Sequence, residues 1–407
     1  MKTPFTVMIK PAGSSCNLSC SYCYYSSAGL STTMSAEILE QFIRQYIEAS
    51  PGPVISFVWH GGEPMLAGLD FYKRAVSLQN KYLPDNWKCW NNLQTNGSLI
   101  DGEWCKFLAA ANFDIGLSID GDQLTHDTNR KDAKGQGTHH QAVAAIRLLQ
   151  SHNIEPDLLC TVNSASTANP LAVYKVLRGF NTGWLQFIPI VRQNEAGQLT
   201  PESVNPGAYG EFLSAIFDEW ALNDQGRLEI QMFAEIRRII SGGSASLCWM
   251  SPSCGRALIV EQDGGVYSCD HFVKPSHHLG NIMSTNLQEL ADLPEQIQFG
   301  EAKKEKLPSR CHACEWLPLC GGGCPKDRIA PGGLNYLCPG LRSFFAYTKP
   351  AFTKISALEK SMHSAEAIMA SLREDLKKLW KGIGRNDPCP CGSSRKAKQC
   401  CWAKRAV

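Results

Sequence analysis

Short apolar runs alternate with longer amphipathic stretches over residues 1–225. The run 54–60 is rich in β-branched and aromatic residues and stops at two glycines, which is typical of a strand that feeds a loop. The stretch 35–49 gathers its apolar residues on one helical face behind Ser35, a suitable N-cap. The expected strands are 7–10, 54–60, 90–94, 115–119, 156–162 and 185–190, and the expected helices are 35–49, 104–111, 141–151, 171–177 and 209–222.

This alternation predicts an α/β fold with a parallel sheet, either open or curled into a partial barrel. In such sheets the chemistry gathers at the carboxyl ends of the strands. We therefore expect functional residues in the loops 61–64, 95–97 and 120–121, which follow three of the predicted strands.

The composition and the hydrophobic pattern change in the rest of the chain. Residues 242–345 are rich in Gly, Pro and Cys and show little helical periodicity, so this segment needs metal clusters to order it. Residues 351–379 carry apolar residues at helical spacing and are expected to form a helix. We therefore expect four parts: a partial barrel over 1–230, a cysteine-rich domain over 242–345, a helical segment over 350–380 and a small basic tail over 385–407.

The composition excludes several classes of protein. Hydrophobic residues make up 43% of the 407 positions and charged residues 19%, as in globular proteins. Lys and Arg total 40 against 38 Asp and Glu, so the charge indicates neither a nucleic-acid nor a membrane partner. No apolar run approaches the roughly 18 residues needed to span a bilayer, and the first residues lack a signal-peptide pattern. We therefore expect a cytoplasmic protein.

The cysteines are the residues that point most clearly to a function, because 15 of the 18 are clustered in the sequence. In a cytosolic chain, thiols at short spacing are metal ligands more often than disulfides. The three scattered cysteines suit a role as small buried apolar residues. The clusters are Cys16, Cys20 and Cys23; Cys248, Cys254 and Cys269; Cys311, Cys314, Cys320, Cys324 and Cys338; and Cys389, Cys391, Cys400 and Cys401.

The first cluster, Cys16-x3-Cys20-x2-Cys23, lies in the loop after the first predicted strand. Thiolates favour iron–sulfur clusters or zinc, but zinc needs four ligands and the next histidine is His60. Three thiolates on a cubane cluster would leave one iron open to a ligand. An open iron at the mouth of a βα barrel suits one-electron chemistry on a bound cofactor.

With Tyr22 before the last cysteine and Gly-Gly-Glu-Pro at 61–64, the sequence resembles the radical S-adenosylmethionine (SAM) superfamily. The resemblance implies a partial (β/α)6 barrel, a [4Fe–4S] cluster and reductive cleavage of SAM to a 5′-deoxyadenosyl radical. It also implies that the loops contact SAM, whereas a plain turn or N-cap is the structural alternative for these residues. The implied SAM-binding residues are Gly61, Gly62, Glu63, Asn96, Ser118 and Asp120.

The eight cysteines between 248 and 338 suffice for two fully ligated clusters. Their spacing alone does not partition them, and zinc on Cys311 and Cys314 with two partners stays open. The pattern resembles the auxiliary-cluster (SPASM) domain of peptide-modifying radical SAM enzymes. The implied ligand sets interleave: Cys248, Cys254, Cys269 and Cys324 on one cluster, and Cys311, Cys314, Cys320 and Cys338 on the other.

Within that group, residues 1–345 most resemble the anaerobic sulfatase-maturating enzymes, through 4–27, the run 264–271 and the run 319–325. The resemblance implies oxidation of a sulfatase Cys or Ser to formylglycine, with Asp270 as general base and Tyr25 in the active site. It further implies auxiliary clusters as electron conduit and a flavodoxin- or ferredoxin-like electron donor. For Asp270 the alternative is turn capping, and for Tyr25 it is packing.

Two other functions stay open from the sequence. One is a different SPASM enzyme that forms thioether or carbon–carbon links in a peptide. The other is an iron–sulfur electron carrier without SAM turnover. In the tail, Cys389, Cys391, Cys400 and Cys401 resemble the SecA C-terminal-type (SEC-C) motif, which implies a structural zinc; the alternative is a disordered tail with loose thiols.

Overall fold

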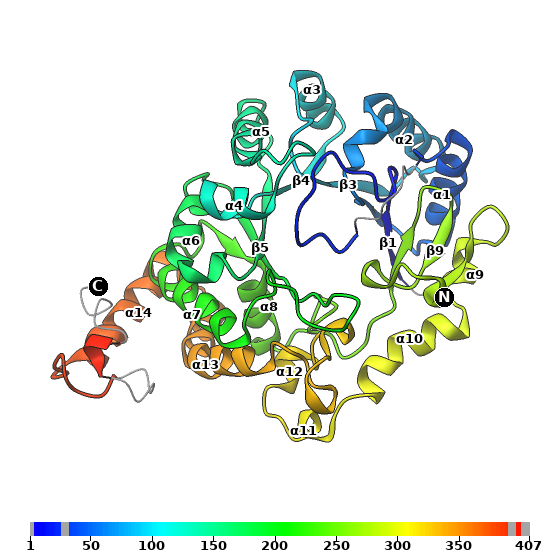
Figure 1. Cartoon of the computed structure of the whole chain (residues 1–407). Helices are drawn as coiled ribbons and strands as arrows, with labels where there is room; N and C mark the ends of the chain where they lie inside the picture. The colour runs from blue at the N-terminus through cyan, green and yellow to red at the C-terminus, as the bar shows by residue number, and fades with distance from the viewer. Residues whose placement is uncertain (1–3, 26–31, 390–395, 400–407) are drawn as a thin grey trace.

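A single curved sheet of ten strands organises the chain (Figure 1). The computed structural model describes residues 4–25, 32–389 and 396–399. The strand order is β10-β9-β8-β1-β2-β3-β4-β5-β6-β7. The strands are β1 (Thr6–Ile9), β2 (Val54–Trp59), β3 (Lys88–Thr95), β4 (Phe113–Ser118), β5 (Asp157–Val162), β6 (Trp184–Pro189), β7 (Glu229–Ile230), β8 (Ala257–Val260), β9 (Gly265–Tyr267) and β10 (His278–Asn281).

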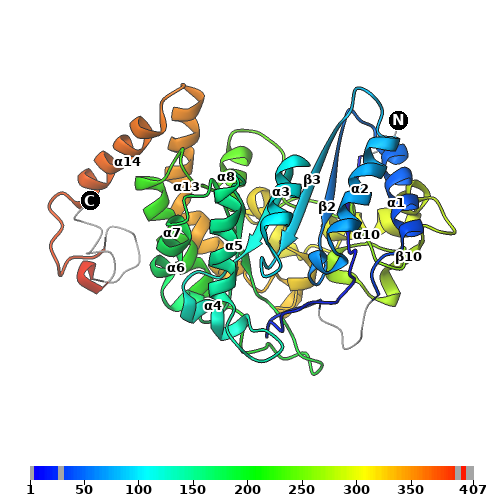
Figure 2. The same cartoon turned by 90° about the horizontal axis from the view of Figure 1, so that it is seen from above.

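Strands β1 to β6 pair in sequence order and in parallel, which confirms the predicted α/β partial barrel. Helices follow the strands and cover the outer face of the curved sheet (Figures 1 and 2). Ser35 caps the first helix by accepting a 3.2 Å hydrogen bond from the N–H of Ile38, as expected. The helices of this part are α1 (Ala36–Ala49), α2 (Leu69–Tyr82), α3 (Gly102–Ala110), α4 (Gln123–Asn129), α5 (His139–Ser151), α6 (Pro170–Arg178), α7 (Pro206–Asn223) and α8 (Gln231–Ile240).

The cysteine-rich region is joined to the barrel through its own strand. Strand β8 pairs in parallel with β1, so that Ile9 lies opposite Val260. Strands β9 and β10 extend the sheet as antiparallel neighbours. This pairing carries the segment after β8 to the same edge as the loop after β1, although the two are about 250 residues apart in sequence.

Residues 242–345 contain more helix than their sequence pattern predicts. The helices that follow β10 are α9 (Leu287–Ala291), α10 (Pro294–Glu305), α11 (Ser309–His312), α12 (Leu317–Cys320) and α13 (Cys338–Lys360). Helix α13 lies against α7 at a crossing of two glycines, where a Cβ on Gly340 would lie 1.7 Å from the carbonyl oxygen of Pro206. At this crossing the two backbones touch and leave no room for a side chain, whereas farther along the same helices the rings of Phe217 and Phe352 pack with 4.6 Å between their centres.

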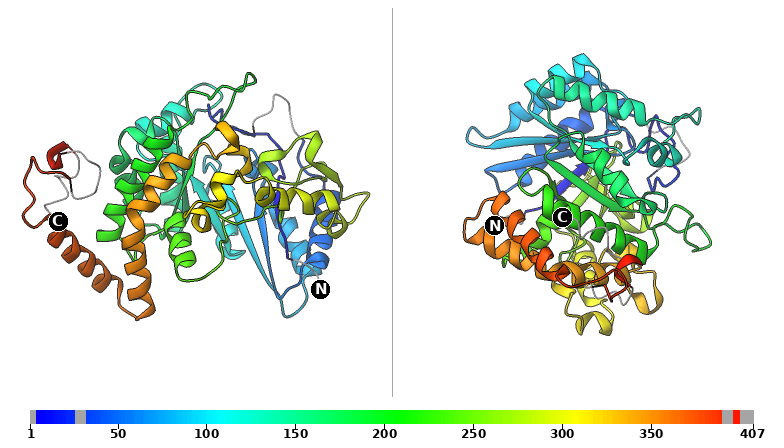
Figure 3. Two further views of the ribbon diagram at one scale, coloured as in Figure 1. Left: turned by 90° about the horizontal axis from the view of Figure 1, so that it is seen from below. Right: turned by 90° about the vertical axis from the view of Figure 1, so that its left-hand side faces the viewer.

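The segment expected to be helical over 351–379 is helical, but it is divided into two helices, and the first of them begins earlier, at Cys338. Helix α13 ends at Lys360, and α14 (Ala365–Trp380) starts after a turn in which Met362 adopts a φ of 59°. Ser364 caps the second helix through the N–H of Ala367, which explains the restart. Helix α14 lies on the side of the molecule opposite α1 (Figures 1 and 3).

In the tail, the buried Cys389 packs with Trp380 and Ala397. The other expected tail ligands, Cys391, Cys400 and Cys401, lie outside the described residues. None of the described helices has the length and apolar character needed to cross a membrane.

Candidate active site

The loop after β1 crosses the opening of the curved sheet and carries the first three cysteines (Figure 1). Hydrogen bonds from Ser19 N to Lys131 O (2.7 Å) and from Ser21 N to Asn129 O (3.0 Å) fasten it to the opposite side of the opening. Burial raises the pKa of the Cys16 thiol to about 11, and the nearby charges of Cys20 and Cys23 add to the effect. The three thiols therefore lie on one short loop at the carboxyl ends of the strands.

The glycine turn after β2 is joined to this loop by backbone hydrogen bonds. The N–H groups of Gly62 and Glu63 donate to the carbonyl oxygens of Gly13 (2.9 Å) and Ser15 (2.8 Å). A Cβ on Gly62 would lie 2.0 Å from the Ser15 oxygen, so only glycine permits this approach. The turn thus fixes the cysteine loop by backbone contact.

Glu63 is almost fully buried at the same edge, with 1% of its surface exposed. Its carboxylate accepts hydrogen bonds from Thr95 Oγ1 (2.8 Å) and from the backbone N–H of Asn96 (2.8 Å). Burial raises the pKa of Glu63 to about 7, although these hydrogen bonds act in the opposite direction. Among the described residues no cationic side chain pairs with Glu63, and such a buried carboxylate is suited to receive a cationic ligand.

Asn96 and Ser118 lie at the ends of β3 and β4. The Asn96 amide donates to Asn17 Oδ1 at 2.9 Å and lies 3.9 Å from Cys16 Sγ, next to the cysteine loop. The Ser118 hydroxyl accepts a 3.0 Å hydrogen bond from Gln94 Nε2. Both residues therefore lie at the expected edge, and Asn96 lies closer to the thiols.

Asp120 is completely buried, and protein donors occupy its carboxylate. Arg130 Nε donates to it at 2.9 Å and the N–H of Thr161 at 2.9 Å, and the hydroxyl of Tyr22 also donates to it. Burial alone would raise the pKa of Asp120, but the Arg130 guanidinium lowers it. Because Tyr22 belongs to the cysteine loop, this geometry favours a supporting role for Asp120 over direct contact with a ligand.

Asp270 follows Cys269 and lies between β1 and the cysteine loop. Lys10, fully buried at the end of β1, donates to Asp270 Oδ1 at 2.5 Å, and the hydroxyl of Tyr24 donates to Oδ2. Burial would raise the pKa of Asp270, but the Lys10 ammonium and then His60 lower it below its usual range. The side chain therefore remains a carboxylate, held at both oxygens.

Tyr25, which the resemblance placed in the active site, lies beside Lys10. Its hydroxyl donates to Glu261, and its ring lies under the Lys10 ammonium, 4.2 Å from Nζ to the ring centre. Lys10 and Tyr24 thus contact Asp270 directly, and sequence reasoning missed both. The available signals were a lysine directly after an apolar strand and a second tyrosine beside Tyr25.

The cysteines of the second region separate into two groups. Cys269 lies close enough to Cys324 and Cys248 for their charges to raise the pKa of its thiol, after the larger effect of burial. The charge of Cys248 likewise acts on Cys254. A buried lysine, Lys303, holds this loop by donating to the carbonyl oxygens of Cys248 (2.6 Å) and Trp249 (3.0 Å).

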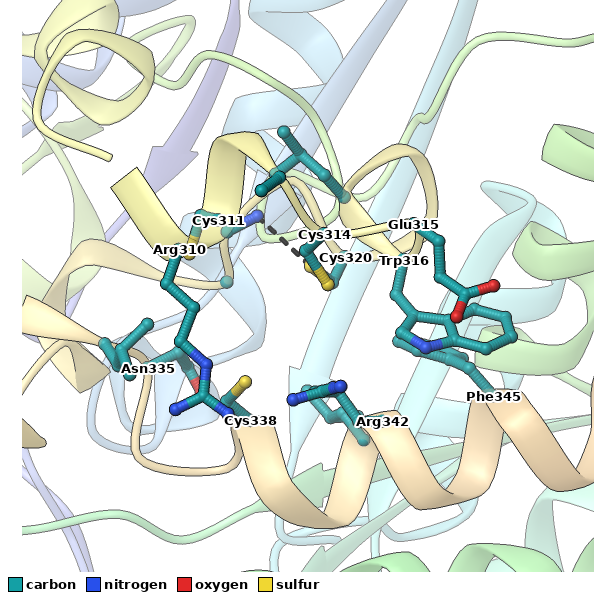
Figure 4. A pocket seen from close by; sticks show the side chains of 16 residues that line it. Arg310, Cys311, Cys314, Glu315, Trp316, Cys320, Asn335, Cys338, Arg342 and Phe345 are labelled. Carbon is teal, nitrogen blue, oxygen red and sulfur yellow. Dashed lines mark hydrogen bonds between the residues drawn. The ribbon is translucent and has the colours of Figure 1, made fainter. Parts of the chain in front are cut away.

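The other four thiols line one cavity of about 310 Å³. Figure 4 shows Cys311, Cys314, Cys320 and Cys338 around this space, with Arg310 and Arg342 beside them. In the part of the chain that the structure describes, no three Cys, His, Asp or Glu side chains converge on a single metal-ion position.

The chain matches three family descriptions: the radical SAM superfamily over residues 11–165, an iron–sulfur cluster-binding domain (SPASM) over 248–315, and the SEC-C motif over 385–403. Among its relatives is a serine-type anaerobic sulfatase-maturating enzyme of Bacteroides thetaiotaomicron, which is 37% identical over 92% of this chain and 97% of the relative. A cysteine-type enzyme of Clostridium perfringens is 34% identical over 87% and 98%.

Comparison with solved structures points to the same family. Native anSMEcpe with bound AdoMet and Cp18Cys peptide matches with a TM-score of 0.81 and 35% identity, over 87% of this chain and 99% of that chain. Streptococcus suis SuiB bound to S-adenosylmethionine, at 14% identity and a TM-score of 0.61, shares the fold. From the cysteine loop, the glycine turn and these matches, we conclude that the chain belongs to the anaerobic sulfatase-maturating enzymes of the radical SAM superfamily.

Proposed function

We propose that this protein is a radical SAM oxidoreductase that oxidises a Cys or Ser side chain of a sulfatase to formylglycine. One observation carries the proposal. The Cys16 loop, the buried Glu63 and Asp270, whose two carboxylate oxygens each accept a hydrogen bond, lie at the same edge of the sheet. Relatives named for sulfatase maturation on serine and on cysteine support the substrate class.

The first three thiols suit a [4Fe–4S] cluster with one iron open, because the sequence has no fourth cysteine near them, the next one being Cys89. Cys16, Cys20 and Cys23 would hold it. With SAM bound, such a cluster would supply the 5′-deoxyadenosyl radical chemistry that removes a hydrogen atom from the substrate β-carbon.

The surrounding residues bind and orient SAM. Glu63 accepts hydrogen bonds from the methionine ammonium group of SAM. The resulting ion pair offsets the unfavourable free energy of a buried, unpaired carboxylate. Gly61 and Gly62 let the backbone approach, and Asn96 and Ser118 present polar groups at the next strand ends. Asp120 contributes by holding the cysteine loop through Tyr22 and Arg130.

Asp270 accepts the proton of the substrate thiol or hydroxyl. A serine side chain that has lost a β-hydrogen atom, this proton and one electron is the aldehyde itself, whereas a cysteine side chain becomes a thioaldehyde, which water hydrolyses to the aldehyde with release of hydrogen sulfide. Lys10 and Tyr24 keep its carboxylate ionised and oriented toward the opening, where its side chain is 16% exposed. Tyr25 contributes indirectly, because its ring and its bond to Glu261 confine Lys10.

The eight remaining thiols of the second region provide two complete ligand sets for auxiliary [4Fe–4S] clusters, which would carry the released electron. Their grouping in the structure supports interleaved ligation. We also propose a structural zinc in the tail and a flavodoxin- or ferredoxin-like electron donor. The proposed ligands are Cys248, Cys254, Cys269 and Cys324 for one cluster, Cys311, Cys314, Cys320 and Cys338 for the other, and Cys389, Cys391, Cys400 and Cys401 for zinc.

The test is anaerobic reconstitution followed by mass spectrometry of a peptide containing Cys/Ser-x-Pro/Ala-x-Arg. The proposal expects 5′-deoxyadenosine and a peptide aldehyde, with the aldehyde lost and 5′-deoxyadenosine retained in Asp270→Asn. A cross-linked peptide instead of an aldehyde would favour a different SPASM activity. The absence of 5′-deoxyadenosine would favour an electron carrier.

A further inference from the structure

A turn of three glycines, 321–323, joins the two groups of thiols in the cysteine-rich region. The turn begins after Cys320 and ends before Cys324, which belong to different groups. A Cβ on Gly322, whose φ is 76°, would lie 2.9 Å from the Nη2 atom of Arg328, so the Arg328 guanidinium packs against this turn. We name the groups the inner set, Cys248, Cys254, Cys269 and Cys324, and the outer set, Cys311, Cys314, Cys320 and Cys338.

The Arg328 guanidinium is fastened to the glycine turn and keeps an N–H group without an acceptor. Its Nε donates to the carbonyl oxygen of Gly322 at 3.3 Å, and the N–H of the same glycine donates to Cys320 Sγ at 3.4 Å. Nη2 is buried, and it has no hydrogen-bond partner among the described residues. An unpaired buried N–H group is unfavourable, and the sulfur atoms of an iron–sulfur cluster accept such hydrogen bonds.

Thiols of both sets lie near this guanidinium. Burial lowers the pKa of Arg328, whereas the charges of four thiols act in the opposite direction. These thiols are Cys311 and Cys320 of the outer set and Cys254 and Cys324 of the inner set. An arginine stays protonated in proteins, and within the described chain no carboxylate pairs with this one. Its positive charge therefore acts on the two sets together.

A second cation of this region, Lys303, differs in both respects. Its ammonium group donates to the carbonyl oxygens of Cys248, Trp249 and Ser251, which satisfies its three N–H groups. Burial lowers the pKa of Lys303, and the thiol charges that oppose this effect belong to the inner set. Lys303 thus holds one loop, whereas Arg328 lies beside both sets and has an N–H group to donate.

We propose that Arg328 raises the reduction potentials of both auxiliary clusters. This inference rests on the proposed function, in which the two sets of thiols hold [4Fe–4S] clusters that receive the electron released by the substrate radical. On reduction each cluster gains one electron and no proton, so its charge becomes more negative by one. A nearby cation stabilises the reduced form, and an N–H···S hydrogen bond has the same effect.

The test measures the two potentials directly, without SAM or peptide. The full-length chain is reconstituted with iron and sulfide in a Cys16→Ala/Cys20→Ala/Cys23→Ala background, which leaves the auxiliary clusters. It is then titrated with dithionite and followed by electron paramagnetic resonance. We expect Arg328→Met to lower both midpoint potentials by about 59 mV or more, which is a tenfold change in each one-electron equilibrium constant. Arg328→Lys keeps the charge and should restore the larger part of both shifts.

The matched control is Arg342→Met, which removes a guanidinium beside the outer set alone. Arg342 is exposed on α13, and its charge acts on the thiol of Cys338, next to which Figure 4 shows it. Because water screens an exposed charge, we expect an unchanged inner potential and an outer shift less than half as large as in Arg328→Met. If Arg328→Met lowers the iron content, Arg328→Gln removes the same charge and keeps an amide that can donate to Gly322.

Four results would overturn this role of Arg328. They are unchanged potentials in Arg328→Met, a shift of one cluster alone, an equal shift of both clusters in Arg342→Met, and potentials that Arg328→Lys fails to restore at full iron content. A background protein that binds no iron would remove the clusters themselves. Failure of the proposed function shows separately, as protein with all its cysteines that forms no peptide aldehyde, since the potentials are measured without substrate.

Discussion

Lys10 Nζ lies 2.5 Å from Asp270 Oδ1, and this ion pair joins the first strand of the barrel to the residue after Cys269. The Lys10 side chain is 0% exposed and the Asp270 side chain 16%. Water therefore screens the pair weakly, and removal of either partner leaves a buried charge without compensation. The pair depends on the pairing of β8 with β1, which brings the two segments together.

We expect Lys10→Met, which keeps side-chain length and removes the charge, to destabilise the protein by about 3–5 kcal/mol. Peptide aldehyde formation should fall about 100-fold or more, because Asp270 loses both its orientation and its ionised state. Cleavage of SAM should continue. Denaturant unfolding and separate assays of 5′-deoxyadenosine and aldehyde check these three outcomes.

The double variant Lys10→Met/Asp270→Asn provides the control. Its stability should recover most of the loss, because no unpaired charge remains, while aldehyde formation stays low. Equal stability of the single and double variants would contradict a buried ion pair.

Substitution of Tyr24 should mainly lower aldehyde formation, whereas substitution of Tyr25 should mainly lower stability. Tyr24→Phe removes the hydroxyl that donates to Asp270, so we expect a fall of about tenfold or more in aldehyde formation with SAM cleavage retained. Tyr25→Phe leaves the buried Glu261 without this donor and should cost about 1–3 kcal/mol of stability. The ratio of aldehyde to 5′-deoxyadenosine distinguishes the two variants. A larger fall in that ratio for Tyr25→Phe would show that Tyr25 is the one that acts at Asp270.

SAM affinity should depend on pH through Glu63. Burial raises the pKa of Glu63 to about 7 in the free protein, so below that pH the carboxyl group is largely neutral. A bound ammonium group favours the carboxylate and lowers this pKa, so protons and SAM compete. We expect affinity to be highest between about pH 7 and pH 8, where the carboxylate and the α-ammonium group are both charged, and to fall up to tenfold per pH unit below about pH 6.

Equilibrium dialysis of labelled SAM against the cluster-loaded protein measures this dependence. Glu63→Gln has the same shape without the charge, so it should bind weakly at every pH and show a flat profile. A wild-type profile that is equally flat would remove Glu63 from the ammonium site.

The sequence predicted the barrel well because its strands carry strong local signals. The run that became β2 is β-branched and aromatic and ends at glycines, and the structure places it at Val54–Trp59. Helix α2 (Leu69–Tyr82) was not predicted, because its buried face includes Ala75 and Gln79, which weaken the apolar period. Its identity as a helix depends on packing against the sheet.

The residues of the candidate site also differ in how far the sequence predicts them. Short motifs such as Cys16–Cys23 and Gly61–Glu63 are local and could be read directly. The Lys10–Asp270 pair joins residues 260 positions apart, and no local pattern encodes it. The choice between Tyr24 and Tyr25 depends on the direction in which each side chain points, which only the folded loop determines.

Gly62 has no side chain, and this lets the glycine turn contact the cysteine loop. In Gly62→Ala the new Cβ would lie 2.0 Å from the carbonyl oxygen of Ser15, next to Cys16, and a backbone oxygen cannot move aside alone. We expect the loop to shift, with loss of iron equivalent to one cluster and a fall of about 100-fold or more in SAM cleavage. Gly102→Ala is the matched control, because nothing lies within 4 Å of a Cβ there. Iron analysis and 5′-deoxyadenosine formation measure both variants, and full iron content with normal cleavage in Gly62→Ala would show that the turn does not position the cysteine loop.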